Sequence, residues 1–390
     1  MVSSARYFHS RNFWKHLPVL IIGVLAGYLV AYNKPLIQQS ISTTSIESIT
    51  SPLQHPVRAA IVALVRNSDL FGLRLAMRQL EDRFNRNHQY PYIFLNDVPF
   101  TEEFKQGVQA LTKAEVKFGE LDEQSWGIPS WIDQERYEKV KRVAQYPHGN
   151  KDSYRKMCRF QAGYLHRHPL LRDLEYYWRI EPDVEYFCDI DYDPFLFMKQ
   201  NGIKYGWNIA MTEFMDTIKT LWNTTKEFIE ENPDLIADKN MLEWLADGDN
   251  GYGGCHFWSN FEIVDLSFYR SQAYQQYFDY LDRAGGFFYE RWGDAPVHSL
   301  AAAMFLSADQ IHYFEDIGYF HPSVLSCPKG ASKQGKCVCD DTRSFVQDGH
   351  CTVRYKQVRK KVLQPGEPYG VHDVHSGPVI MAEAYVGTVG

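Results

Sequence analysis

The first part of the expected folded body alternates between buried-strand and amphipathic-helix patterns. Residues 58–65 (RAAIVALV) form a continuous apolar run typical of a buried strand, and apolar residues at helical spacing follow over 70–84. Residues 90–95 predict a second strand, which ends at Asn96 and Asp97. We therefore expect a strand–helix–strand unit of a parallel sheet, in which ligands bind beyond the carboxyl ends of the strands.

A further predicted strand ends in a pair of carboxylates. Residues 176–180 (YYWRI) run into Glu181, a proline and Asp183. The proline stiffens the turn, and we expect the two carboxylates to converge on one divalent cation. Similar acidic pairs over 189–193 and 247–249 are interpreted as helix caps or turns.

The N-terminal region has the pattern of a membrane anchor. Residues 17–32 are apolar and uncharged, and three basic residues precede them. No small-x-small cleavage site follows directly, so we predict an uncleaved signal anchor rather than a signal peptide. The basic flank places the tail 1–16 in the cytosol and the rest of the chain in the lumen, with the Ser/Thr-rich residues 33–56 as a stem. This single-pass type II layout is typical of enzymes of the Golgi membrane.

Composition narrows the class of protein. The 390 residues are 45% hydrophobic and 23% charged, which fits one large α/β domain with appendages. A net charge of −7 argues against nucleic acid as a partner. No GxGxxG motif follows the first strands, and the sequence contains no P-loop motif. The chain therefore lacks these two standard phosphate-binding loops. Aromatic residues make up 15% of the chain, a hint of a carbohydrate ligand.

The cysteines indicate disulfides in an oxidising compartment. Four of the seven lie within residues 327–351, where a stapled loop is the favoured interpretation and zinc the rival, with poor spacing. The other three, Cys158, Cys188 and Cys255, lie in apolar or motif contexts, and the odd total leaves at least one thiol unpaired. Asn223 is in the only glycosylation sequon, which is consistent with lumenal exposure.

Several longer motifs carry a family resemblance over residues 55–355. They are LVRN, FLND, YRKMCRF, YYWRIEPDVEYFCDIDYDPF, CHFWSNFEI and FYERWGDAPVHS, in this order. The sequence resembles the fungal GDP-mannose-dependent α-1,2-mannosyltransferases of glycosyltransferase family 15. The resemblance implies a GT-A type fold, an α/β Rossmann-like mixed sheet flanked by helices. It also implies Mn²⁺ dependence and transfer of mannose, with retention, from GDP-mannose to mannose residues of O-linked or N-linked glycans on glycoproteins or oligomannosides. We set the catalytic domain at 57–355 and a flexible tail at 356–390.

The resemblance assigns the metal and donor residues one by one. Glu181 matches the metal ligand of the family and His321 its second protein ligand, while Asp183 lies by the ion or the donor ribose. The positions that match basic or aromatic residues around the nucleotide are Arg66, Tyr154, Arg159 and Arg179. A packing role for His321 and a structural ion pair for Arg159 are the alternatives.

The resemblance also assigns the residues of the transfer step. Glu262 matches the proposed nucleophile, and retention needs either a covalent glycosyl-enzyme or front-side departure of GDP. On its own, a Glu between Phe261 and Ile263 would be interpreted as a solvent-facing strand residue. Asp294 matches a carboxylate that acts as general base on the acceptor hydroxyl or orients it. Trp292 is predicted to be an acceptor-stacking platform, with a core role as the alternative.

Two departures and two competing functions complete the prediction. The Gly-rich residues 247–254 and the tail from about 362 match nothing expected of the family. A non-catalytic mannoside-binding or scaffold protein of the same fold is the alternative function. A glycoside hydrolase would also use paired carboxylates, but it would not need a metal-type acidic pair at a nucleotide-binding strand end.

Overall fold

The structure is a computed structural model that describes residues 55–365 apart from 249–250, 334 and 345. The predicted cytosolic tail and membrane anchor, and nearly all of the stem, lie outside the described residues. Within the described part of the chain, no helix combines the length and apolar character needed to cross a membrane.

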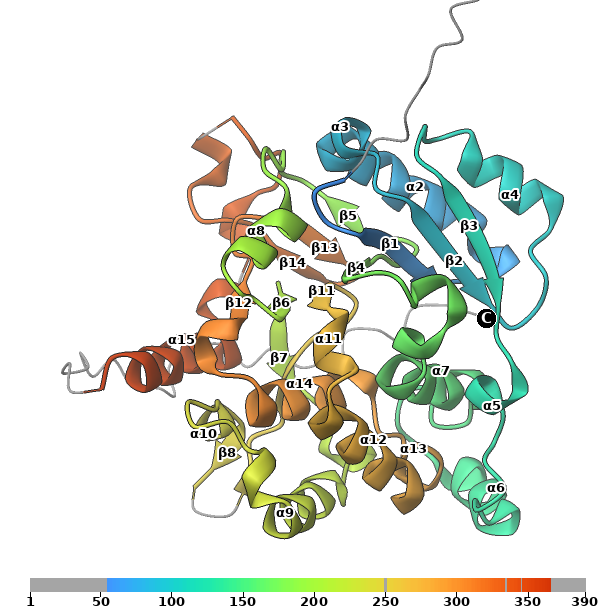
Figure 1. The fold of residues 1–390 in the computed structure, drawn as a ribbon, viewed down its shortest axis with the longest axis vertical. Helices are drawn as coiled ribbons and strands as arrows, with labels where there is room; N and C mark the ends of the chain where they lie inside the picture. The colour runs from blue at the N-terminus through green and yellow to red at the C-terminus, as the bar shows by residue number, and fades with distance from the viewer. Residues whose placement is uncertain (1–54, 249–250, 334, 345, 366–390) are drawn as a thin grey trace, which may run out of the picture. The chain divides into compact units, whose positions relative to one another are not determined.

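A seven-stranded mixed sheet forms the centre of the body (Figure 1). Its order is β12-β6-β11-β4-β1-β2-β3, and β11 alone runs against its neighbours β4 and β6. The strands are β1 (Ala59–Leu64), β2 (Tyr92–Asn96), β3 (Val116–Glu120), β4 (Tyr176–Arg179), β6 (Tyr205–Trp207), β11 (Glu262–Asp265) and β12 (Ile311–Tyr313). The predicted parallel pairing of the first two strands is confirmed, with Ile61 opposite Tyr92. The α/β class expected from the sequence is also confirmed.

Helices cover both faces of this sheet because its strands bury side chains on alternate sides. On one face α2 (Leu70–Leu80), α4 (Glu102–Gln109) and α8 (Pro194–Gln200) contribute Leu73, Phe104 and Phe195 to one core. On the other face α7 (Asp152–Gly163), α12 (Gln272–Ala284) and α14 (Asp294–Phe305) contribute to a second core (Figure 1). The sheet therefore has no solvent-facing side near its centre.

Further helices and three small sheets complete the body. The other helices are α3 (Arg86–His88), α5 (Glu123–Trp126), α6 (Gln134–Val143), α9 (Leu221–Glu231), α10 (Leu242–Leu245), α11 (Leu266–Tyr269), α13 (Gly286–Tyr289) and α15 (His350–Leu363). Three small sheets pair β10 (Cys255–Phe257) with β7 (Ala210–Thr212), β8 (Ala246–Asp247) with β9 (Gly251–Tyr252), and β13 (Tyr319–His321) with β14 (Val324–Ser326) and β5 (Glu185–Tyr186). The Gly-rich approach to β10 thus contributes the β8–β9 pair.

The cysteine pairing corrects the expected self-contained loop. Only Cys327–Cys339 lies within the cysteine-rich segment, whereas Cys188–Cys337 and Cys255–Cys351 join that segment to the rest of the body. Cys158 is the free, buried thiol, which confirms that one cysteine stays unpaired. The partners are 149 and 96 residues apart for the two longer links, so local spacing could not reveal them.

The boundary expected between domain and tail at 355/356 is also wrong. Helix α15 runs through it to Leu363, and its Tyr355 and Val358 are buried in the core. The hydroxyl of Tyr355 donates to the carbonyl oxygen of Ile311 in β12 at 3.0 Å. The folded body therefore includes this helix, and residues 366–390 lie outside the description.

Candidate active site

The reversed strand β11 brings a carboxylate to the carboxyl edge of its parallel neighbours. Ile263 of β11 pairs with Trp178 of β4, so Glu262 at the start of β11 lies beside Arg179 at the end of β4. The turn with Glu181 and Asp183 follows β4 directly. Candidate residues from distant parts of the sequence thus meet at the edge where open α/β sheets bind ligands.

Arg179 is the central cation of this edge. Its Nη1 lies 2.6 Å from Asp294 Oδ2, and its Nε lies 2.9 Å from Glu181 Oε1. Asp294 opens helix α14 and also accepts a hydrogen bond of 2.7 Å from the hydroxyl of Ser259. Burial disfavours the charged guanidinium, but the facing carboxylates outweigh it and raise the pKa of Arg179. The predicted donor-binding arginine therefore links the predicted metal ligand to the predicted acceptor carboxylate.

Glu181 and His321 form the candidate metal pair. His321 Nε2 in β13 lies 3.5 Å from Glu181 Oε2, and both side chains are partly exposed. Burial opposes ionisation of Glu181, but the attraction of Arg179 and His321 outweighs it and lowers its pKa to about 2. An ionised carboxylate and an imidazole suit Mn²⁺. Among the described residues no group of three or more His, Cys, Asp or Glu side chains is placed to hold a metal.

Asp183 does not share the partners of Glu181. It adopts a positive φ of 62°, and its carboxylate lies against the backbone of Gly72 in α2. A Cβ on Gly72 would come within 2.4 Å of Asp183 Oδ1, so a larger residue there would displace this carboxylate. The left-handed turn directs Asp183 to the start of α2, so it contacts a different element from the partners of Glu181.

Of the acidic pairs that the sequence predicts to be caps or turns, one residue is a cap, two lie in ion pairs, and Asp247 lies in strand β8. Asp193 caps α8 by accepting from the backbone amides of Phe195 and Leu196. Asp189 pairs with Arg83, and Asp191 with Lys336. These acids do not join the candidate site.

Glu262 is fully buried, contrary to the solvent-facing position that its sequence neighbours alone would indicate. Tyr177 donates to its Oε1, while the hydroxyls of Tyr205 and Tyr269 lie 3.0 and 3.3 Å from its Oε2. His298 Nδ1 lies 2.9 Å from the same Oε2. Both oxygens are thus hydrogen-bonded, and helices cover the face of the sheet on which the side chain lies.

Arg159 lies in a buried bidentate ion pair. Its Nε and Nη2 contact Asp282 Oδ1 and Oδ2 of α12 at 2.7 and 2.8 Å. The guanidinium also donates to the hydroxyl of Tyr164 at 2.7 Å. This geometry matches the alternative stated for Arg159, a structural ion pair. The structure therefore gives no support to a donor-binding role for Arg159.

The predicted acceptor platform at Trp292 is wrong. The ring is 1% exposed and packs against the backbone of Gly286, and its Nε1 donates to Glu290 Oε2 at 2.8 Å. A stacking surface needs an exposed ring face, which Trp292 lacks. Its core alternative is the correct interpretation.

The other predicted donor residues lie on separate elements. Arg66 follows β1 and is exposed, and its backbone amide donates to Asp69. Tyr154 of α7 stacks on His148 with ring centroids 4.5 Å apart, and the guanidinium of Arg291 lies 5.1 Å from its ring. In the described part of the chain, Arg66 and Tyr154 therefore lie on different elements from the Arg179 cluster.

Sequence analysis missed three buried polar residues near these groups. Arg291 pairs with Glu213 at 3.4 Å, and both are buried. His298 lies four residues after Asp294 in α14 and contacts Glu262. Arg291 and His298 are in the FYERWGDAPVHS motif, and the available signal for His298 was a polar residue on the otherwise apolar helix α14.

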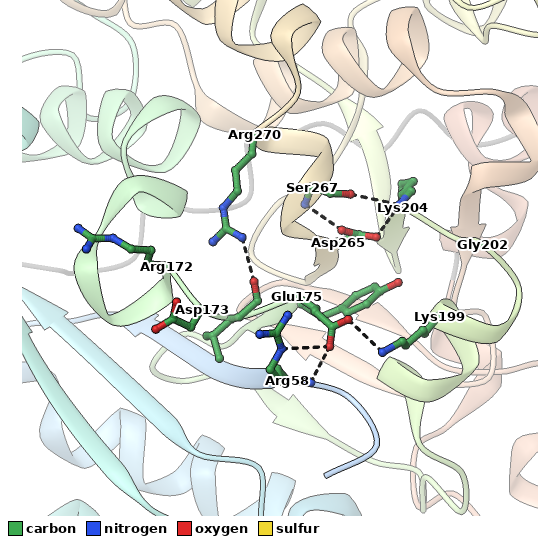
Figure 2. Close-up of a pocket in the computed structure, with 12 residues that line it drawn as sticks. Arg58, Arg172, Asp173, Glu175, Lys199, Gly202, Lys204, Asp265, Ser267 and Arg270 are labelled. Carbon is green, nitrogen blue, oxygen red and sulfur yellow. Dashed lines mark hydrogen bonds and ion pairs between the residues drawn. The ribbon is translucent and has the colours of Figure 1, made fainter. Parts of the chain in front are cut away.

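A cavity of about 440 Å³ lies elsewhere, at the amino edge of the sheet (Figure 2). The residues that line this cavity include ones just before β1, β4 and β6 and at or after the end of β11. Much of its positive charge is neutralised within the pocket, where Glu175 pairs with Arg58 and Lys199, and Asp265 with Lys204 (Figure 2). It contains none of the predicted site residues.

Comparison with known proteins identifies the family. The family model described as glycolipid 2-alpha-mannosyltransferase matches residues 31–360. This chain belongs to that mannosyltransferase family. It is 46% identical to glycolipid 2-alpha-mannosyltransferase 1 of Candida albicans, over 90% of this chain and 81% of that protein. It is also 46% identical to alpha-1,2 mannosyltransferase KTR1 of Saccharomyces cerevisiae, over 82% of each chain.

Solved structures of relatives give the same family and fold. Core-mannan synthase A of Aspergillus fumigatus, in its Mn/GDP form, is 40% identical with a TM-score of 0.72, over 78% of this chain and 84% of that one. The S. cerevisiae mannosyltransferase Ktr4p in complex with GDP is 35% identical with a TM-score of 0.73, over 90% and 92%. The family resemblance and the GT-A type fold expected from the sequence are confirmed, and the chain is a glycosyltransferase.

Proposed function

We propose that this mannosyltransferase moves mannose from GDP-mannose, in α-1,2 linkage and with retention, to mannose residues of O-linked or N-linked glycans. The observation that carries the proposal is the Glu181–Arg179–Asp294 ion-pair chain beside His321, at the ligand-binding edge of the sheet. Relatives with 35–40% identity bind GDP, one of them with manganese. Named relatives are α-1,2-mannosyltransferases of glycolipids and O-glycosides.

Glu181 and His321 would hold Mn²⁺. When this ion is bound, it would neutralise the charge that develops on the departing diphosphate. Arg179 keeps Glu181 ionised and so preserves its ability to act as a ligand. Arg66, Tyr154 and Asp183 are the remaining candidates for contacts to the nucleotide. The residues of this chain therefore fit the metal that the family implies.

Glu262 would act through its charge. A retaining transfer must stabilise positive charge on the sugar ring as GDP departs. Because both oxygens of Glu262 are hydrogen-bonded in a covered position, the geometry favours electrostatic stabilisation and front-side departure over a covalent bond.

Asp294 would orient the acceptor hydroxyl rather than remove its proton. Burial raises the pKa of Asp294, but Arg179 and His298 outweigh burial, so the net pKa is lowered. A carboxylate that is stabilised in its ionised form is a weak general base.

The test is an assay of the purified full chain with GDP-mannose, Mn²⁺ and α-mannosides, with the linkage of the product read by NMR. We expect an α-1,2-linked product and GDP release that depends on acceptor. Binding of GDP and mannosides without any product would overturn the proposal in favour of a non-catalytic binding protein.

A matched pair of variants tests the metal ligands. We expect Glu181→Ala or His321→Ala to abolish transfer and to weaken Mn²⁺-dependent GDP binding in calorimetry, because each removes a ligand of the ion. Asp189→Asn changes an acid that pairs with Arg83 instead and should keep wild-type activity. Normal turnover of either alanine variant at limiting Mn²⁺ would remove that residue from the metal site.

We further propose the single-pass type II topology in the Golgi membrane, with residues 17–32 as anchor and the catalytic body in the lumen. Asn223 is exposed on α9, in keeping with a glycosylation site. Protease added to sealed vesicles should remove only a short N-terminal tail, and Asn223→Gln should remove a glycosidase-sensitive mass shift. Digestion of the body in intact vesicles would contradict this topology.

A further inference from the structure

The buried carboxylate Glu262 has a partner that the proposed mechanism leaves without a role. His298 is fully buried, and its Nδ1 lies 2.9 Å from Glu262 Oε2. A carboxylate oxygen accepts in this contact, so we assign the ring hydrogen to Nδ1. On the other side of the ring, Nε2 faces the carbonyl oxygen of Gln161 at 3.3 Å. Both ring nitrogens therefore face buried polar atoms.

The position of His298 in α14 couples it to the rest of the site. His298 and Asp294 are four residues apart, so they lie on the same face of the helix. Asp294 contacts Arg179, while His298 contacts Glu262. Arg179 and Glu262 are themselves neighbours on β4 and β11. One helix face therefore contacts both strand-end side chains.

The histidine differs from the other donors to Glu262 in its rigidity. The hydrogens of the tyrosine hydroxyls can rotate towards other acceptors, whereas the direction of an imidazole N–H is fixed by the ring plane. The hydroxyl of Tyr269 lies 2.9 Å from His298 Nδ1 and 3.3 Å from Glu262 Oε2, and its contact with the carboxylate is the longest of the set. His298 is thus the donor best suited to fix the carboxylate in one orientation.

We propose that His298 is a positioning residue for mannosyl transfer, which holds the charged Glu262 carboxylate in place beside Arg179. The inference rests on the proposed function, because the orientation of Glu262 affects turnover only in a working transferase. His298 acts through Glu262 and makes no contact with the substrate itself.

Two substitutions of similar size separate this role from packing. His298→Asn keeps an N–H donor near the position of Nδ1, while His298→Leu has the same number and branching of side-chain heavy atoms and no donor. Both lose the ring, so comparing them with each other isolates the donor better than comparing either with the wild type. We expect the Leu variant to have a kcat at least ~10-fold below that of the Asn variant, with KM for GDP-mannose changed by less than about 3-fold. Equal kcat values for the two folded variants would overturn the inference.

A double-mutant cycle tests whether the effect passes through Glu262. On a Glu262→Gln background the negative charge that His298 positions is absent, so the difference between the Leu and Asn variants should shrink to within about 2-fold. A difference that persists undiminished would overturn the inference. If His298→Leu does not fold, the test rests on His298→Asn, which keeps the N–H donor. A loss of more than about 10-fold in its kcat with normal GDP binding would contradict the inference.

His256 supplies the matched control. It is also a buried histidine, and its Nδ1 lies 3.4 Å from the carbonyl oxygen of Gly254 rather than near Glu262. His256→Asn and His256→Leu should not differ in kcat, and a similar difference there would show a general packing effect and overturn the inference. A wild-type chain that transfers no mannose would overturn the proposed function itself. Active wild type with equal His298 variants would overturn only the role of His298.

Discussion

At the scale of the residue, burial determines which hydrogen bonds the carboxylate of Glu262 makes. A charge without water around it is stable only when donors surround it, and here three tyrosines and a histidine do so. Such a complete set of donors fixes both the orientation of the carboxylate and its charge. We therefore treat its charge, rather than its nucleophilicity, as its contribution to transfer.

Glu262→Gln tests that charge. The amide keeps the shape and removes the negative charge, so we expect kcat to fall by at least ~10²-fold while GDP-mannose affinity changes much less. Steady-state kinetics and calorimetric binding of GDP measure the two quantities. Near-normal kcat would show that Glu262 is a structural residue and that the reaction depends on another group.

Trp292 gives the opposite case, a predicted site residue that belongs to the core. We expect Trp292→Phe to lower the free energy of unfolding by about 1–3 kcal/mol, through a smaller ring and the lost hydrogen bond to Glu290. KM for the mannoside acceptor should stay unchanged. Urea unfolding and acceptor titrations measure the two effects. A raised KM for the acceptor at unchanged stability would support the original prediction that Trp292 stacks on the acceptor.

At the scale of the element, disulfides fix peripheral helices and loops to the sheet-centred core. The Cys255–Cys351 bond joins β10 to the start of α15, although 96 residues separate the two cysteines. The Cys327–Cys339 bond closes a segment with a separation of only 12 residues. A longer closed loop restricts the unfolded chain more, so the two bonds differ in their expected contribution to stability.

We expect Cys351→Ser to destabilise the protein more than Cys327→Ser, with the difference on the order of 2 kcal/mol from loop length alone. The thermal unfolding midpoints of the two variants, measured without reductant, provide the comparison. Equal losses would mean that local packing around each bond, rather than chain entropy, sets its contribution.

At the scale of the whole molecule, buried neutral histidines connect stability to pH. His166 is 3% exposed. Burial, reinforced by Arg167 and Arg270, lowers its pKa to about 3. In the unfolded chain a histidine has a pKa of about 6.5. Between these two values the unfolded chain binds a proton that the folded chain does not, so stability falls as the pH drops below about 6.5.

We expect this residue to account for about 2 kcal/mol of lost stability between pH 7 and pH 5. His166→Gln removes the titrating group, so the urea midpoint of that variant should depend less on pH than that of the wild type. A variant with the same pH dependence as the wild type would show that other groups dominate acid unfolding.

The sequence by itself determined the elements and the family. Continuous apolar runs predicted β1, β2 and β4 because buried parallel strands need apolar side chains on both faces, and this signal is local in the chain. The acidic turn after β4 and the ordered motifs identified the mannosyltransferase family and, through it, the fold. Among the candidate residues, the sequence named Glu181, Arg179, Asp294, His321 and Glu262, which the structure brings to one edge of the sheet or directly beside it.

The tertiary structure alone decided which of these residues meet and which are buried. Arg159 pairs with Asp282 at a sequence separation of 123 residues, and Cys188 bonds to Cys337 at a separation of 149. Neither partner can therefore be predicted from local spacing. Glu262 lies in the sheet between β4 and β6, where both faces are covered, although an alternating pattern would suggest solvent. Trp292 likewise owes its burial to the backbone of Gly286. Burial and pairing depend on contacts between segments distant in sequence, and only the folded chain specifies those contacts.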